Sequence, residues 1–508
     1  MGIWKEKACA VKCALYTVCT SVALAVGPWA VQQNRYVFAL FLTLLAVAGY
    51  FYIVLAIAGR NWLDIRAVFH GVWVFTIGLA ALKLTEYQED WQTKTWLCIA
   101  SAYAMFQIGA NLGMWLNCRY AHGISKRVAG FKLGRLSWKS SPNRLFGICV
   151  VTTLIGLGCF VVNVMIRGFI PCFSDDPAAY LTFYTRFHVF AVASTVASGF
   201  CYYCIKTQKL ATWKKLVLWG CILYLTFLFP IMVVSRGTFV TSALSLTVSV
   251  FYLNRKKFTV LVCCVVMIVG VYVGASMLRG YTDAQLEVFF EPATIVGTEP
   301  TESQATEPSE TTSTEPSETT STEPIDTEAT ADSSTPGSTP GAVFTFRLPP
   351  KAVFLYSYLT VSHDNFNEAV QNSKKMSWGL RQIAPFNVIL RSDKIEQARN
   401  NMENYLVRDH LNTVNLIGDF YYDFHEWGVS LLMLLWGAVF GVMQAFSENH
   451  TGPISLLVLG NAMTPVALNF FSAWTSVFSF WLMWGTALLM AIALYAKISP
   501  KTEIKEEH

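Results

Sequence analysis

Residues 412–446 read NTVNLIGDFYYDFHEWGVSLLMLLWGAVFGVMQAF, and this stretch decides the class of fold. Its second part, 427–446, is apolar and carries no charged side chain. A run of about 20 such residues spans the hydrocarbon core of a bilayer as a helix, which pairs its backbone N–H and C=O groups internally. Its first part, 412–426, is rich in acidic and aromatic residues. The stretch therefore predicts a membrane helix that begins at a polar face.

The same apolar pattern recurs along the 508 residues of the chain. Hydrophobic residues make up 54% of it, charged residues make up 14%, and the mean hydropathy is +0.41. These values exclude an ordinary soluble domain. We predict an all-α polytopic membrane protein with about twelve transmembrane helices. The predicted spans are 11–31, 36–58, 65–85, 95–116, 145–166, 185–205, 216–234, 238–253, 259–278, 427–446, 453–472 and 474–496.

The distribution of lysine and arginine predicts the orientation of the chain. Basic residues are dense in the connections 117–144, 206–215 and 254–257, and sparse in the short connections between them. The positive-inside rule then places both termini in the cytoplasm and residues 279–426 outside. The net charge of +5 is mostly this excess of basic residues in the inner connections, and it indicates no nucleic-acid partner.

The long polar loop divides the chain into parts. We predict a membrane domain of nine spans at 1–278, the extracytoplasmic loop at 279–426, a membrane domain with spans ten to twelve at 427–496, and a cytoplasmic tail at 497–508. The loop holds most of the residues able to do chemistry. They are Arg381, Arg391, Arg399, Arg408, His363, Asp364, His410, Asp419, Asp423 and His425.

Within this loop, residues 298–341 consist mainly of Thr, Ser, Glu and Pro, and the octapeptide TEPSETTS occurs twice. Such a segment buries too little surface to offset the entropy of ordering it, so we predict a disordered insert. Helical periodicity at 351–376 and 393–409 predicts a small helical cap on the outer membrane surface.

Two arginines stand at predicted outer helix ends. Arg236, within Ser235-Arg236-Gly237, follows the seventh span, and Arg279 follows the ninth. Arginine bridges two anionic oxygens and keeps its charge when partly buried. The plain alternative is an interfacial arginine that snorkels to lipid headgroups. With Arg381 and Arg391 in the cap above them, we predict an anion site that binds a diphosphate at the depth of the headgroups.

The run 412–428 provides a second group of candidate residues. In a helix, Asp419 and Asp423 lie on one face. A carboxylate or the neighbouring His425 at the water–lipid boundary can take a proton from a hydroxyl group. The aromatic residues fit a simple interface belt, but they can also stack on sugar faces. We predict Asp423 and His425 as catalytic candidates, with Asp419, Tyr421 and Tyr422 as substrate-binding residues, and we expect no metal.

These motifs resemble those of the bacterial oligosaccharide repeat-unit polymerases, the O-antigen polymerase (Wzy-type) family. The matching features are Ser235-Arg236-Gly237, Arg279-Gly280 and the Asn-x-x-Asn…Phe-Tyr-Tyr-Asp-Phe-x-x-x-Gly run at 412–428. One dominant outer loop before the last three spans also matches. Members of this family often read Asp-Phe-Gly where this chain has Asp423-Phe424-His425.

The resemblance implies a membrane-embedded glycosyltransferase of the bacterial cytoplasmic (inner) membrane that needs no cofactor. The donor is a growing glycan on polyprenyl diphosphate, and the acceptor is a single lipid-linked repeat unit. A sugar hydroxyl of the acceptor attacks the anomeric carbon of the donor, and polyprenyl diphosphate leaves. The product is a surface polysaccharide, which means a capsule, an exopolysaccharide or an O-antigen. The expected partners are polyprenyl-diphosphate-linked oligosaccharides, membrane lipid, and flippase and chain-length regulator proteins.

Two alternatives stay open. An O-antigen ligase-like transferase would move the glycan to a different acceptor. A polysaccharide transporter or flippase would place ionisable residues near the bilayer midplane and would commonly show internal repeats. The predicted span interiors hold few such residues, and Lys83 lies close to a span end.

Overall fold

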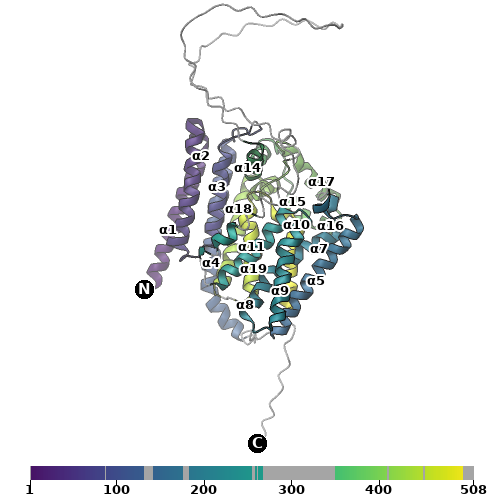
Figure 1. Cartoon of the computed structure of the whole chain (residues 1–508). Coiled ribbons are helices and arrows are strands. Elements are labelled where there is room, and N and C mark those ends of the chain that lie inside the picture. Colours follow the sequence, from purple (N-terminus) through teal and green to yellow (C-terminus); the bar gives the residue numbers. More distant parts are fainter. Residues whose placement is uncertain are drawn as a thin grey trace, which may run out of the picture.

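The computed structural model describes residues 2–85, 87–130, 141–174, 182–254, 258–259, 261–266, 270, 349–408, 411–449 and 452–495. Within these ranges the fold is all-α and contains no β-strand (Figure 1). Six of the described helices are long and apolar enough to cross a membrane, and four shorter helices are also apolar. The prediction of an all-α polytopic membrane protein is therefore confirmed, while the number twelve stays a prediction.

The helices follow the order of the predicted spans. They are α1 (Gly2–Ala25), α2 (Gly27–Tyr52), α3 (Ile65–Ala80), α4 (Thr93–Gly130), α5 (Pro142–Arg167), α7 (Arg186–Ser194), α8 (Ala197–Thr207), α9 (Thr212–Leu223), α10 (Phe229–Met232), α11 (Arg236–Leu253), α14 (Pro350–Asn372), α15 (Leu380–Ile383), α16 (Asn387–Leu390), α17 (Asp393–Asn401), α18 (Leu416–Asn449), α19 (Pro453–Leu468) and α20 (Phe478–Tyr495). Most of the ninth predicted span, 259–278, lies outside the described residues, as do the insert 298–341 and the tail 497–508.

Local residue choice accounts for several helix ends. Asp64 caps α3 and Ser141 caps α5, each through a side-chain oxygen that accepts a backbone N–H of the first turn. Gly168, with φ of 78°, ends α5 in a left-handed conformation. The predicted break between the first two spans appears as a kink inside α2, where Asn34 leaves helical geometry.

The molecule has two polar ends. The cap, which we define as the described residues of 349–415, lies at one end together with the connections 81–92 and 469–477. The N-terminus of α1 points towards the other end (Figure 1). The predicted topology, in which the N-terminus and the large loop lie on opposite sides of the membrane, stays a prediction.

Glycines hold α18 tightly against α4. A Cβ atom at Gly109 or Gly113 of α4 would lie 2.1 Å from a carbonyl oxygen of α18. A Cβ atom at Gly437 or Gly441 of α18 would lie 2.2 Å from a carbonyl oxygen of α4. Both helices thus carry glycines four residues apart, which lets the two backbones touch as in small-residue crossings of membrane helices. This crossing fixes the position of α18, whose cap end carries the predicted catalytic residues.

Candidate functional site

A buried ion pair joins the cap to the start of α18. Arg381, in α15, donates from Nε to Oδ1 of Asp419 at 3.0 Å. The other oxygen of Asp419 accepts a hydrogen bond from the hydroxyl of Ser476, in the connection 469–477. The Asp419 side chain is fully buried, whereas the Arg381 side chain keeps 17% exposure. One carboxylate therefore holds together the cap, α18 and this connection.

Arg381 is a permanent cation, and Asp419 accepts a hydrogen bond from its Nε. Burial disfavours its charge, but the attraction of Asp419, with a further contribution from Asp423, raises the pKa of Arg381 above its ordinary value. Among the residues that the structure describes, neither η nitrogen of Arg381 has a hydrogen-bond partner. A guanidinium held by one edge in this way can offer its other edge to an anion.

Asp423 holds the turn that presents Arg381. Its carboxylate accepts hydrogen bonds from the backbone N–H groups of Arg381 and Gln382, at 3.0 Å each, and from the hydroxyl of Ser377. Gly379, with φ of 85°, turns the chain immediately before these two N–H groups. Asp423 is fully buried. Because its carboxylate accepts two N–H groups of the first turn of α15, it caps this short helix.

Arg236 lies at the same end of the molecule, at the start of α11. Ser235 caps this helix, because its hydroxyl accepts the backbone N–H of Thr238. The Arg236 guanidinium lies 4.2 Å from the ring centre of Tyr358 and 5.3 Å from that of Phe354, both in α14. It also donates a hydrogen bond to the hydroxyl of Tyr358. The helix start and two cap aromatic rings together orient this cation.

Both arginines border the connection 469–477. A Cβ atom at Gly237 would lie 3.4 Å from the indole of Trp474, which is an ordinary van der Waals contact, so the start of α11 lies beside this indole. Tyr358 stacks on Phe471 with ring centres 5.1 Å apart. Because Ser476 of the same connection binds Asp419, these contacts bring the Ser-Arg-Gly motif and the Arg381–Asp419 pair to one region. The sequence did not single out Trp474, Phe471 or Ser476.

His425 has the most unusual backbone of the site. Its φ of 54° and ψ of −150° interrupt α18, in a region of backbone space that is essentially restricted to glycine. Its ring stacks on Tyr421 with centres 5.0 Å apart, and its buried Nε2 has no hydrogen-bond partner among the described residues. Beside it, Lys94 and Glu426 form an ion pair of 2.5 Å. A glycine at this position would relieve strain that costs about 1–3 kcal/mol.

The remaining predicted site residues have other surroundings. Arg391 is exposed and adopts a left-handed conformation, with φ of 50°, directly after α16. Arg279 lies outside the described residues. Tyr421 and Tyr422 are both buried, so their rings serve packing in this arrangement.

Asp364 is the centre of a polar network that sequence reasoning did not assign to the site. Its carboxylate accepts hydrogen bonds from Lys83 at 2.7 Å, Gln88 at 2.7 Å and Trp91 at 2.8 Å. Burial lowers the pKa of Lys83, although the neighbouring Asp364 opposes this shift. The position of Lys83 at a predicted outer span end was the available signal. This ion pair ties the cap to the connection between α3 and α4.

His363 adjoins this network and is fully buried. Burial, with a smaller effect from the Lys83 cation, lowers the pKa of His363 to about 3, so the imidazole is neutral. Its two ring nitrogens lie within hydrogen-bond distance of Thr76 and Asn415. A cavity of about 260 Å³ lies next to the network, lined by Tyr87, Glu89, Asp364, Asn367, Glu368, Val407 and Arg408.

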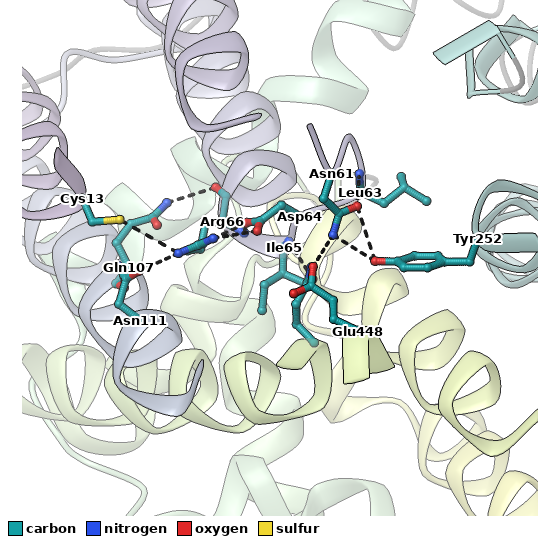
Figure 2. Close-up of polar contacts among 11 residues, drawn as sticks. Cys13, Asn61, Leu63, Asp64, Ile65, Arg66, Gln107, Asn111, Tyr252 and Glu448 are labelled. Carbon is teal, nitrogen blue, oxygen red and sulfur yellow. Dashed lines mark hydrogen bonds and ion pairs between the residues drawn. The ribbon is translucent and has the colours of Figure 1, made fainter. Parts of the chain in front are cut away.

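A second polar cluster lies around the start of α3 (Figure 2), whereas the cap contacts the connection that follows the other end of α3. Arg66 binds Asp64 through Nε at 2.9 Å and Nη2 at 2.7 Å, and binds Asn111 through Nη1 at 2.8 Å. Asn61 donates to Glu448 at 2.6 Å. The sequence did not single out this cluster, because Asn111 and Glu448 come from helices distant in the chain.

No family model, curated protein or solved structure matches the chain.

Proposed function

We propose that the protein joins polyprenyl-diphosphate-linked oligosaccharide repeat units into a surface polysaccharide at the outer face of the bacterial cytoplasmic membrane. One observation carries most of this proposal. Arg381 is held along one edge by a buried carboxylate at the end of a membrane helix, and it keeps its other edge for a ligand. Such a cation suits a diphosphate whose lipid tail lies in the bilayer.

The strained backbone at His425 also supports the proposal. The repeat-unit polymerases, which this chain resembles, often carry glycine at the corresponding position. The conformation found here, with φ of 54° and ψ of −150°, is one that glycine adopts freely. The backbone conformation at position 425 and the resemblance thus both favour glycine there.

In the proposed reaction, Arg381 and Arg236 bind the diphosphate of the donor. As the glycosidic bond to the diphosphate breaks, negative charge grows on the leaving oxygen, and fixed guanidinium groups stabilise that charge. Arg391 and Arg279 stay candidates for the same role. The acceptor hydroxyl loses its proton as it attacks the anomeric carbon.

The hydrogen bonds suggest different roles for the two proton-acceptor candidates. The sequence argument puts Asp423 first, but its buried carboxylate already accepts three hydrogen bonds and holds the turn of Arg381. A general base needs a lone pair that the substrate can reach. Unlike the Asp423 oxygens, the Nε2 of His425 has no hydrogen-bond partner among the described residues, but it is buried, so a substrate reaches it only after a local movement of its surroundings. We therefore assign Asp423 a positioning role and His425 the role of proton acceptor.

A ligase-like transfer would use the same donor and the same arginines, so only the product separates it from polymerisation. The transporter alternative receives less support, because the ion pairs Arg66–Asp64 and Lys83–Asp364 lie near opposite ends of the molecule. The deciding experiment is the surface glycan of a deletion strain complemented with wild-type protein or with Arg381→Lys. Polymerase activity predicts a ladder that collapses to one repeat unit. Lipid-linked polymer that accumulates without transfer to its final acceptor would instead identify a ligase.

A further inference from the structure

The short helix α16 exposes an apolar surface at the cap end. Val388 is 54% exposed, Ile389 is 70% exposed and Leu390 is 55% exposed, and Ile383 of α15 adds a further 42% exposed side chain. Three consecutive exposed apolar residues are unusual for a surface in contact with water. We call these four residues the α16 patch.

The next helix shows the pattern expected of a water-facing element. In α17, the apolar residues Ile395 and Ala398 are buried, and the exposed positions are polar or charged, such as Gln397 and Arg399. The two helices are separated by only two residues. Adjacent helices of the cap therefore expose different kinds of side chain, polar in α17 and apolar in α16.

The α16 patch lies beside the start of the apolar helix α20. Phe386, directly before α16, packs against Phe478 and Trp481 with ring centres 6.4 Å and 5.6 Å apart. Phe478 is the first residue of the apolar helix α20, and Trp481 is one turn further along it. Tryptophan near the end of a membrane helix marks the boundary between headgroups and hydrocarbon. The α16 patch is thus next to this boundary.

The flanking charges fit a lipid leaflet. Arg391 and Lys394 follow the patch, and both are exposed. Basic side chains beside apolar residues at a membrane surface reach up to lipid phosphates while the apolar residues contact the acyl chains. We propose that the α16 patch inserts into the acyl region of the outer leaflet and anchors the cap to the bilayer. This inference goes beyond the proposed reaction and depends on the membrane character of the chain and, for the choice of the outer leaflet, on the predicted orientation.

The test measures the depth of residue 389 directly. A genetically encoded fluorescent amino acid replaces Ile389 in the full chain, which is then placed in nanodiscs of phosphatidylglycerol and phosphatidylethanolamine that contain no polyprenyl lipid. Gln397 of α17, substituted in the same way, is the matched control. We expect lipids with a nitroxide on the acyl chain to quench position 389 at least twofold more than position 397, and aqueous iodide to show the reverse order.

Three results would overturn the inference. Iodide quenching of position 389 equal to that of position 397 would place the patch in water. Protection of position 389 from both quenchers would show that protein covers it, either a second copy or another chain. Protection that appears only after a polyprenyl phosphate is added would assign the patch to that lipid instead of the bulk leaflet. Ile389→Asp provides a second test, and we expect it to reduce acyl-nitroxide quenching of a fluorophore at position 388.

Discussion

Two buried arginine–aspartate pairs occur among the described residues, Arg66–Asp64 near the start of α3 and Arg381–Asp419 at the cap, and their arginines use their donors differently. Arg66 gives Nε and Nη2 to Asp64 and Nη1 to Asn111, so all three guanidinium nitrogens are engaged within the protein. Arg381 gives Nε to Asp419, and its two η nitrogens have no hydrogen-bond partner within the described part of the chain. The exposed fractions of the side chains are similarly modest, at 10% and 17%. The two arginines therefore differ in how many donors the described residues engage, more than in how far their side chains are buried.

The largest effect on stability is expected at the fully engaged pair. Arg66→Ala leaves Asp64 buried without its cation, which should lower the free energy of unfolding by about 3–5 kcal/mol. Thermal unfolding of the purified protein in nanodiscs measures this loss. Arg35→Ala is the matched control, because Arg35 pairs with Asp90 at the surface, and exposed pairs contribute about 0–1 kcal/mol. Equal losses for the two variants would contradict the distinction between them.

The largest effect on activity is expected at the partly engaged pair. Arg381→Lys keeps a positive charge for Asp419 but removes the second edge of the guanidinium, so polymer formation should fall by about 10²-fold or more. The measurement is the length and amount of surface glycan at matched protein levels. Arg66→Lys should behave in the opposite way, with lower thermal stability and near-normal polymer at a permissive temperature. Normal polymer from Arg381→Lys would remove the central support of the proposed function.

A smaller effect separates the two proton-acceptor candidates. His425→Gly relieves backbone strain, so the free energy of unfolding should rise by about 1 kcal/mol, while loss of a general base should lower turnover by about 10²-fold. Asp423→Asn keeps an oxygen that caps α15, so polymer should stay within about tenfold of wild type. Initial rates of polymer formation and thermal unfolding together measure both effects. An inactive Asp423→Asn beside an active His425→Gly would return the role of base to Asp423.

The smallest effect is expected from the insert. The contacts described for Arg66 and for Arg381 come from residues outside 298–341, and this segment has almost no large apolar side chain. Deleting it and joining Val296 to Val343 through a short linker should leave polymer output near wild type. The surface glycan of the complemented deletion strain again provides the measurement. Complete loss of polymer at normal protein levels would show that the insert takes part in the reaction.

Sequence reasoning predicted the elements of the site better than their partners. It identified Asp419 and Asp423 as neighbours on one helix, and it placed Arg236 at a helix end near the cap, because both properties follow from local spacing. It did not predict that Asp423 caps α15 or that Ser476 binds Asp419, because the first set of contacts joins residues 41 and 42 positions apart and the second joins residues 57 positions apart. It also passed over Lys83, whose partner Asp364 is 281 positions away.

The sequence alone determined that this is a helical membrane protein. The length of an apolar run and its lack of charge are local properties, and they suffice to decide whether the run can cross a bilayer as a helix. It also determined where polar connections interrupt the helices. The tertiary structure decided which nitrogens of Arg66 and Arg381 find partners among the described residues, because that depends on atoms brought together from distant helices. It likewise decided that His425 occupies a backbone conformation suited to glycine and that four glycines bring α4 and α18 into contact. These features arise from packing, which no single stretch of the chain encodes.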